Sequence, residues 1–211
     1  MTKPLFIARQ GRRPSGLLGR LVARVMASET ARENARALDL LELAAGDNLL
    51  EVGCGHGRPL FEALKRGDDI RATGVDFSPV MLRAARRRNH TYVASGQVSL
   101  LNGDSADLPF DDGTYSAALA VHVIYFWERP EQHLSELLRV LAPGGRLVLG
   151  YRPGDDPGYL AEANTQVYLG RKLSEVEHLV NVCGFTNTHS VREQVGKRLM
   201  VFTVAEKPGL W

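Results

Sequence analysis

From residue 49 onward, short apolar runs alternate with longer amphipathic stretches, and few folds accommodate this order. The short runs are typical of buried strands, whereas the stretches between them carry apolar residues at helical spacing. This alternation favours strand–helix–strand units, which build a parallel sheet with helices on its faces. We therefore predict strands over Leu49–Val52, Ala72–Asp76, Val98–Leu101, Ser116–Val121 and Arg146–Leu149, with helices over Pro59–Arg66, Pro79–Asn89 and Pro130–Leu141.

The C-terminal part of the chain follows a different order. Ser174 and Glu177 have the spacing of a capping box, which predicts a helix that begins there and ends near Gly184. Two further strands are expected over Thr186–Val191 and Leu199–Ala205. The segment between them is too short for a crossover helix and suits a hairpin, so the last strand should run antiparallel to its neighbours.

The N-terminal part carries two helical patterns before the first strand. Apolar residues recur at helical spacing over 17–26, and a second helix is expected over Asn34–Leu43. We predict that residues 1–46 form a helical cap and that residues 47–211 form a single α/β domain. The cap and residues 154–170, an insertion before the capping-box helix, are expected to cover the ligand edge of the sheet.

Composition and charge limit the classes of function. The 211 residues are 44% hydrophobic and 24% charged, an ordinary globular mixture, and 26 basic against 24 acidic residues give a net charge of +2. So small a charge does not favour nucleic acid as a partner. Cys54 and Cys183 do not suggest a disulfide framework, and no apolar stretch has the length of a membrane span. We therefore expect a soluble, cytoplasmic protein without a secretory signal.

The most informative segment is glycine-rich and covers residues 49–58, Leu-Leu-Glu-Val-Gly-Cys-Gly-His-Gly-Arg. It leads from a predicted strand into a helix, and its glycines allow a sharp turn and the close approach of a ligand. Asp76 follows at the end of the second strand, where a carboxylate can accept hydrogen bonds from both ribose hydroxyls of a nucleoside. The spacing departs from Gly-x-Gly-x-x-Gly, because the third glycine is Gly57 and Arg58 occupies the sixth position.

Glu51 lies two residues before the first glycine of this segment and narrows the choice of ligand. A carboxylate at this position would repel a pyrophosphate but would suit an ammonium group. S-adenosylmethionine combines an adenosine and an ammonium group without a phosphate, and we predict it as the cofactor. Asp104 ends the third strand, where it can meet the adenine amino group. Each acid also has a structural explanation, as a solvated strand-end residue or a turn former.

These segments resemble the motifs of class I S-adenosylmethionine-dependent methyltransferases over nearly the whole chain. The first motif of that family matches Leu49–Gly57, its ribose motif matches Gly74–Ser78, and its adenine segment matches Asn102–Phe110. Arg139–Gly145 is similar to the turn before strand five, and Tyr125–Trp127 is similar to a segment of one branch. That branch contains the ubiquinone/menaquinone-biosynthesis C-methyltransferases and many small-molecule enzymes.

The resemblance implies an α/β, Rossmann-like, seven-stranded sheet in the order 3-2-1-4-5-7-6, with strand 7 antiparallel and helices on its flanks. It also implies methyl transfer from S-adenosylmethionine to a small-molecule acceptor. By the same resemblance, Glu51, Gly53, Cys54, Gly55 and Gly57 lie at the methionine moiety of the cofactor, Asp76 at the ribose, Phe77 and Met81 beside the adenine, Asp104 and Ser105 at the adenine edge, and Val121 near the other face of the cofactor.

Methyl transfer from a sulfonium is an in-line displacement, so positioning and exclusion of water can supply most of the catalysis. His122, at the end of strand four, is the candidate catalytic base if the acceptor must lose a proton, and a hydrogen-bonded packing role is the alternative. No metal site is predicted, because Cys54 and His56 would need further ligands. Six aromatic residues after strands four and five either line an apolar or aromatic acceptor pocket, for a quinone- or lipid-like acceptor, or belong to the core: Tyr125, Phe126, Trp127, Tyr151, Tyr159 and Tyr168.

Other functions are compatible with parts of the pattern. An NAD-dependent oxidoreductase would share the Gly-x-Gly segment and the acid of strand two, although Glu51 and Arg58 count against it. A methyltransferase acting on RNA or protein is a further alternative, but strand four lacks the Asn/Asp-Pro-Pro-aromatic tetrapeptide of enzymes that modify bases. The basic amphipathic segment 17–27 has a composition that suits an anionic membrane surface, and packing on the domain is the favoured explanation.

Overall fold

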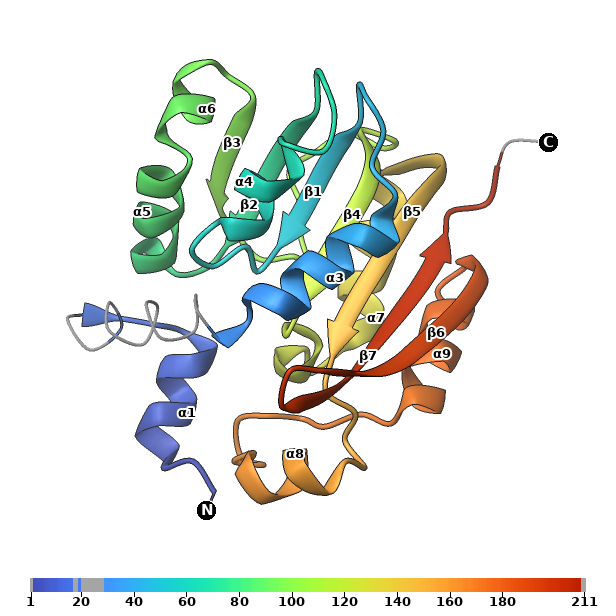
Figure 1. The fold of residues 1–211 in the computed structure, drawn as a ribbon. Coiled ribbons are helices and arrows are strands. Elements are labelled where there is room, and N and C mark those ends of the chain that lie inside the picture. The colour runs from blue at the N-terminus through green and yellow to red at the C-terminus, as the bar shows by residue number, and fades with distance from the viewer. Residues whose placement is uncertain (1, 17–18, 20–28, 210–211) are drawn as a thin grey trace.

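The structure is a computed structural model that describes residues 2–16, 19 and 29–209 (Figure 1). Helices and strands alternate along most of the chain, as the sequence predicts. In chain order the elements are α1 (Leu5–Arg12), α3 (Ala31–Leu41), β1 (Asn48–Val52), α4 (Arg58–Ala63), β2 (Arg71–Asp76), α5 (Pro79–Arg88), α6 (His90–Ala94), β3 (Val98–Asn102), β4 (Tyr115–Val121), the 3-10 turn η1 (Ile124–Phe126), α7 (Pro130–Val140), β5 (Leu141–Tyr151), α8 (Pro157–Glu162), α9 (Leu173–Val182), β6 (Thr186–Val195) and β7 (Arg198–Glu206).

The strands form a seven-stranded sheet in the order β3-β2-β1-β4-β5-β7-β6. The strands β1 to β5 run parallel, so that Leu50 pairs with Thr73 of β2 on one side and with Ala118 of β4 on the other. In contrast, β7 is antiparallel to both β5 and β6, and the hairpin that joins β6 to β7 includes Gly196 with a φ of 62°. The predicted strand order and the antiparallel last strand are confirmed.

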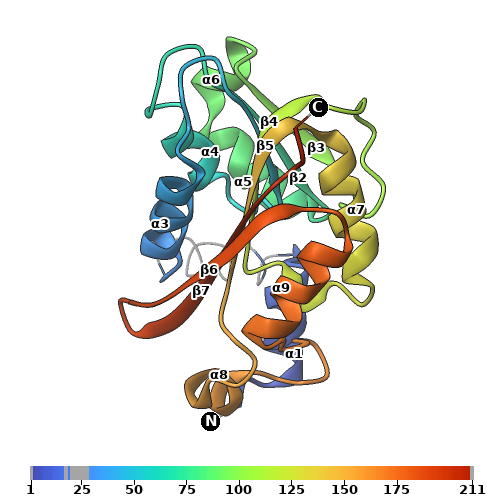
Figure 2. The ribbon, with the colours of Figure 1, turned by 90° about the vertical axis from the view of Figure 1, so that its right-hand side faces the viewer.

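Helices cover both faces of this sheet (Figure 2). On one face, Leu50 of β1 belongs to the same buried cluster as Leu134 of α7 and Val176 of α9. On the other face, Leu49 belongs to a cluster with Leu38 of α3 and residues of α4. Consecutive strand residues are therefore both buried, which explains why the strands read as continuous apolar runs instead of alternating patterns.

The boundaries of several elements differ from the sequence prediction, and for α9 and β5 the local sequence gives the reason. The helix α9 begins at Leu173 after the N-cap residue Lys172, whose backbone N–H donates to Oε2 of Glu175 at 2.9 Å. The predicted pairing of Ser174 with Glu177 is therefore wrong by two residues, because the two capping patterns overlap. Strand five is longer than predicted, because α7 passes into β5 at Leu141 without an intervening loop.

Among the described residues of the N-terminal part, the helix α1 was not predicted and the helix α3 was. The unpredicted helix α1 is followed by the predicted helical pattern over 17–26, which lies outside the described residues except for Gly19. The predicted second helix is α3, and it packs on the sheet, since Leu38 shares a buried cluster with Leu119 and Val148. The division of the chain at residue 46 stays a prediction. None of the helices described is long and apolar enough to cross a membrane.

Candidate active site

The glycine-rich segment connects β1 to α4 at the carboxyl end of the parallel strands. Gly53, Gly55 and Gly57 all have positive φ, at 66°, 53° and 69°. A Cβ atom at Gly53 would lie 2.5 Å from Cγ2 of Val123, and one at Gly57 would lie 2.7 Å from Nδ2 of Asn89. Both the backbone conformation and the surrounding space therefore require glycine, and a larger residue would have to move the turn.

Asp76, at the end of β2, ties this turn to the neighbouring strand. Its Oδ2 accepts a hydrogen bond from the backbone N–H of Gly55 at 2.9 Å, and its Oδ1 accepts one from the N–H of Ser78 at 2.8 Å. Burial raises the pKa of the Asp76 carboxyl group, although both backbone hydrogen bonds favour its charged form. A carboxylate can accept about four hydrogen bonds, so Asp76 forms the turn and still has capacity for the hydroxyls of a ribose.

Glu51, near the end of β1, is buried with an unpartnered oxygen. Only 4% of the residue is exposed, and its Oε2 has no hydrogen-bond partner among the described residues. Burial raises the pKa of the Glu51 carboxyl group well above its usual range, and the nearby charge of Asp76 raises it further. An ammonium group of a ligand would supply both the missing donor and the missing counter-charge. These residues therefore fit S-adenosylmethionine, the predicted cofactor.

The loop after β3 carries two predicted site residues and brings them to α7. Oδ1 of Asp104 accepts a hydrogen bond from the N–H of Ala106 at 3.0 Å, and the hydroxyl of Ser105 lies 2.8 Å from Nδ1 of His133. The His133 ring stacks on Trp127 with ring centroids 4.7 Å apart and 7° between the planes. Burial lowers the pKa of His133, so its imidazole is neutral at pH 7 and can exchange a hydrogen bond with Ser105.

A clamp on α7 holds this loop in place. Oε2 of Glu136 accepts a hydrogen bond from the N–H of Leu108 at 2.8 Å. The guanidinium of Arg139 donates to the carbonyl of Leu108 at 2.8 Å and to that of Phe110 at 2.7 Å. Hydrogen bonds from Arg139 also lower the pKa of Glu136, which keeps the pair charged. The clamp satisfies the backbone of an irregular segment and so fixes the position of Asp104 and Ser105.

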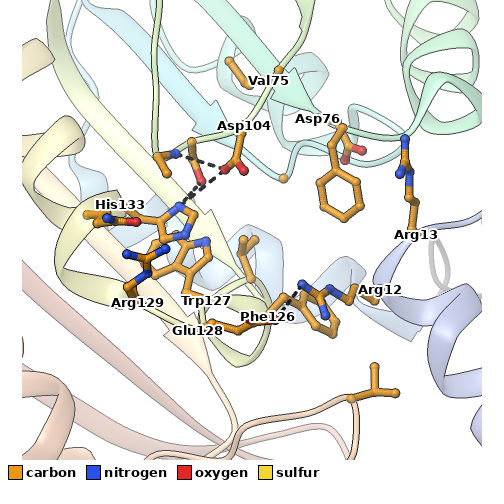
Figure 3. A pocket seen from close by; sticks show the side chains of 18 of the residues that line it. Arg12, Arg13, Val75, Asp76, Asp104, Phe126, Trp127, Glu128, Arg129 and His133 are labelled. Carbon is orange, nitrogen blue, oxygen red and sulfur yellow. Dashed lines mark hydrogen bonds and ion pairs between the residues drawn. The ribbon is translucent and has the colours of Figure 1, made fainter.

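A cavity of about 760 Å³ lies at the carboxyl ends of β1, β2 and β3 (Figure 3). Of the predicted site residues, Gly53, Asp76, Phe77, Asp104 and Ser105 line the cavity. The structure also brings in Trp127 and His133, which no motif indicated as a pair. His133 lies four residues before Leu137 and seven before Val140, on the buried side of α7, and a polar residue in that apolar stripe is the signal that was available.

The remaining predicted residues are near the cavity without lining it. Cys54 is buried within the glycine turn, and Met81 is buried on α5, where its N–H donates to Oγ of Ser78 at 3.4 Å. Val121 pairs with Gly150 of β5 at the end of its strand. The roles assigned to these residues, and to Glu51, Gly55 and Gly57, stay predictions.

His122 is held by hydrogen bonds on both ring nitrogens. Its Nδ1 lies 3.1 Å from the hydroxyl of Tyr125, and its Nε2 contacts Oε2 of Glu33 from α3. The backbone N–H of Arg152 donates to the Tyr125 hydroxyl, so that hydroxyl is free to donate its own proton to Nδ1. In this arrangement the N–H at Nε2 of His122 is the donor to Glu33. A catalytic role for His122 stays a prediction, and the structure places the residue in a closed network instead of the cavity wall.

The roof of the cavity comes from α1 and from the insertion over 154–170. The N–H of Lys3 donates to the carbonyl of Glu162 at 3.0 Å, and Nδ2 of Asn164 donates to the carbonyl of Lys3 at 3.1 Å. At the other end of this N-terminal segment, the hydroxyl of Ser78 donates to the carbonyl of Pro14 at 2.6 Å. The segment thus spans from the insertion to the residues beside Asp76, and Arg9, Arg12 and Arg13 line the cavity from it.

The six aromatic residues divide between the two predicted roles. Phe126 and Trp127 line the cavity. Tyr125 is buried in the core and stacks with Tyr159, at a centroid distance of 5.6 Å. Tyr151 is also fully buried, with its hydroxyl 3.1 Å from the hydroxyl of Thr203. In the part of the chain that the structure describes, no three His, Cys, Asp or Glu residues form a group that would hold a metal ion.

Comparisons with known proteins agree with this geometry. A family model for a methyltransferase domain matches residues 50–149. The chain is 30% identical over 184 residues to the uncharacterized methyltransferase YdaC of Bacillus subtilis (strain 168), over 87% of this chain and 96% of that protein. It is 37% identical over 112 residues to the ubiquinone/menaquinone biosynthesis C-methyltransferase UbiE of Roseobacter denitrificans, over 53% of this chain and 45% of that protein. Unlike its match to YdaC, the chain spans only about half or less of the length of several other curated relatives.

A solved structure shows the same fold. Phosphoethanolamine N-methyltransferase 2 of Haemonchus contortus, in complex with phosphomonomethylethanolamine and S-adenosylhomocysteine, superposes with a TM-score of 0.76 at 16% identity. The superposition covers 90% of this chain and 57% of that one.

Proposed function

Because the chain belongs to the family of S-adenosylmethionine-dependent methyltransferases, we propose that it methylates a small molecule with an apolar or aromatic body. The observation that carries this proposal is a single cavity that joins the predicted ribose and adenine residues to apolar side chains. Asp76 and Phe77 belong to the predicted cofactor side, and Phe126 and Val167 contribute apolar side chains to the lining of the same cavity. A pocket of this size has room for a cofactor beside a small acceptor.

The residues of the chain divide the work of holding the cofactor. Glu51 would receive the ammonium group, Asp76 the ribose hydroxyls, and the loop with Asp104 and Ser105 the adenine edge. When bound, S-adenosylmethionine supplies a methyl carbon that an acceptor lone pair attacks in line, while the sulfur leaves with the bonding electrons as a neutral thioether. The remaining contribution of the protein is orientation and exclusion of water, and the roof formed by α1 and the insertion would provide both.

A general base is needed only for an acceptor that must lose a proton. His122 is the candidate that the sequence gives, and it would have to release Tyr125 to expose Nδ1. An acceptor that reacts as an anion, or through an electron-rich carbon, needs no general base, so His122 would not have to release Tyr125. The quinone-related name of the UbiE relative supports an aromatic acceptor as one class to test.

The test has two steps. Calorimetric titration should show S-adenosylmethionine and S-adenosylhomocysteine binding in the micromolar range, and an NADH titration should show none. A metabolite library is then screened for acceptor-dependent release of S-adenosylhomocysteine, with tRNA and histone mixtures as macromolecular comparators. Release only with the macromolecules, or tight binding of NADH alone, would contradict the proposal.

A further inference from the structure

The arginines around the cavity outnumber the acids that are available to them. Arg9, Arg12, Arg13 and Arg129 all line it, and the two acids on its cofactor side are already engaged. Asp76 accepts two backbone hydrogen bonds, as described above. Asp104 accepts one from Ala106 and lies 3.7 Å from Nδ1 of His133.

Among residues 2–16, 19 and 29–209, the only ion pair that a cavity-lining arginine forms is between Arg12 and Glu128, at 3.5 Å. The side chains of this pair are 44% and 75% exposed, so water screens the attraction and a ligand can displace it. Arg9, Arg13 and Arg129 form no ion pair with the residues described. Figure 3 shows Arg13 and Arg129 on opposite sides of the cavity, with the guanidinium of Arg12 between them.

Two further observations orient this positive rim. The guanidinium of Arg13 lies over the ring of Phe77, 5.7 Å from its centroid, which holds the side chain beside the predicted adenine position. Val123, Phe126 and Val167 add apolar side chains to the lining of the same cavity. A ligand that fits both the arginines and the apolar lining has an anionic group and an apolar or aromatic body. Guanidinium groups pair with carboxylate or phosphate through two parallel hydrogen bonds, so either group would suit the arginines.

We propose that the arginines Arg9, Arg13 and Arg129 select a methyl acceptor that carries a carboxylate or phosphate group on an apolar body. This inference rests on the proposed function and narrows its substrate class. The methionine carboxylate of the cofactor is the competing anion. Replacing an arginine that binds the acceptor should lower the affinity for the acceptor alone. Replacing an arginine that binds the cofactor carboxylate should also lower the affinity for the cofactor.

The experiment uses small probes in place of the unknown acceptor. Benzoate, phenyl phosphate and neutral benzamide are titrated calorimetrically into the full chain, both free and saturated with S-adenosylhomocysteine. We expect at least one anion to bind about tenfold or more tightly than benzamide, and the preference to weaken in high salt. The affinities of benzoate and phenyl phosphate, compared with each other, show whether the arginines prefer a carboxylate or a phosphate group.

Arg9→Gln, Arg13→Gln and Arg129→Gln should each reduce the preference for the anion, and the triple variant should abolish it. Arg83→Gln is the matched control, because Arg83 is an exposed arginine of α5 that does not line the cavity. Affinity for S-adenosylhomocysteine should stay within about twofold in Arg9→Gln, Arg129→Gln and the Arg83→Gln control. Arg13→Gln also removes the contact with Phe77 and is therefore judged on the preference for the anion alone. Equal binding of benzamide and the anions would overturn the inference, as would a parallel loss of cofactor affinity in Arg9→Gln and Arg129→Gln. If the wild type binds no cofactor, the proposed function fails separately, and the titration of the free chain still tests the rim.

Discussion

Two buried glutamates, Glu33 on α3 and Glu51 on β1, show how different surroundings give one residue type different roles. Both are almost inaccessible, with 2% and 4% of the residue exposed. Glu33 has partners on both carboxylate oxygens: Oε2 contacts Nε2 of His122, and Oε1 accepts from Arg198 at 3.3 Å. Oε2 of Glu51 has none among the described residues.

The pKa values of the two groups move in opposite directions. Burial acts to raise the pKa of Glu33, but hydrogen bonds and charges from His122 and Arg198 more than compensate, and the pKa is lowered. The pKa of Glu51 is raised by burial and by the charge of Asp76. A buried carboxylate with partners stabilises the fold, whereas one without them is unfavourable until a ligand supplies what is missing.

The largest effect is expected for Glu33→Ala. Removing this carboxylate leaves His122 and Arg198 without their shared acceptor, and breaking such a buried pair costs about 3–5 kcal/mol of stability. Denaturant unfolding should show this loss, while the folded fraction binds S-adenosylhomocysteine within about twofold of wild type. Glu193→Ala is the control: Glu193 pairs with Arg36 at 2.6 Å with both side chains about one-third exposed, and should cost at most about 1 kcal/mol. Equal losses in the two variants would contradict the distinction.

Asp76→Ala is expected to affect both quantities at once. The Asp76 carboxylate resembles both glutamates. It accepts hydrogen bonds from the backbone N–H groups of Gly55 and Ser78, and it also lines the cavity, where it can accept further hydrogen bonds from a ligand. Charge-assisted hydrogen bonds contribute about 1.5–3 kcal/mol each, so cofactor affinity should fall about tenfold or more and the melting temperature should fall as well. Calorimetry and thermal unfolding on one preparation measure both. A lower melting temperature with unchanged affinity would leave Asp76 as a turn former only.

Glu51→Gln should separate binding from stability. The amide keeps the shape but removes the buried charge, so the free protein should become more stable, while affinity for S-adenosylmethionine should fall about tenfold. Matching titrations with 5′-methylthioadenosine, which lacks the ammonium group, provide the control and should show no such loss. If both ligands lose affinity equally, Glu51 shapes the turn and does not bind an ammonium group.

Short-range signals in the sequence pointed to five residues that line the cavity: Gly53, Asp76, Phe77, Asp104 and Ser105. The glycines of the turn and Asp76 are imposed by local backbone geometry and by strand ends, both of which are visible in a single segment. The strand order followed from the resemblance, and the antiparallel β7 also from the length of its hairpin.

The rest depends on contacts between distant segments, and for these the sequence has no local signal. Glu33 lies 89 residues before His122, and the predicted helix began at Asn34, one residue too late to include it. The helix α1 was also missed, since only Ala8 among its residues is buried and its pattern is short. Arg9, Arg12 and Arg13 line the same cavity as Arg129 only after the chain has folded, so the charge of the cavity was not predictable from composition.

The smallest effect, and the most direct comparison of the two glutamates, is the dependence of stability on pH. An unfolded glutamate titrates near pH 4.3. The folded pKa of Glu33 is lower, so its contribution is present above about pH 4.3 and is lost as the pH falls below that value. The folded pKa of Glu51 is higher, so its contribution is present below about pH 4.3 and is lost as the pH rises above that value.

Urea unfolding of the wild type, Glu33→Gln and Glu51→Gln from pH 7 to pH 3.5 should therefore give two difference curves. The advantage of Glu51→Gln over the wild type should disappear between pH 7 and about pH 4.3, whereas the deficit of Glu33→Gln should shrink only below about pH 4.3, each by at most about 1.4 kcal/mol per pH unit. If both difference curves changed over the same pH range, the folded-state pKa values of Glu33 and Glu51 would not be shifted in opposite directions.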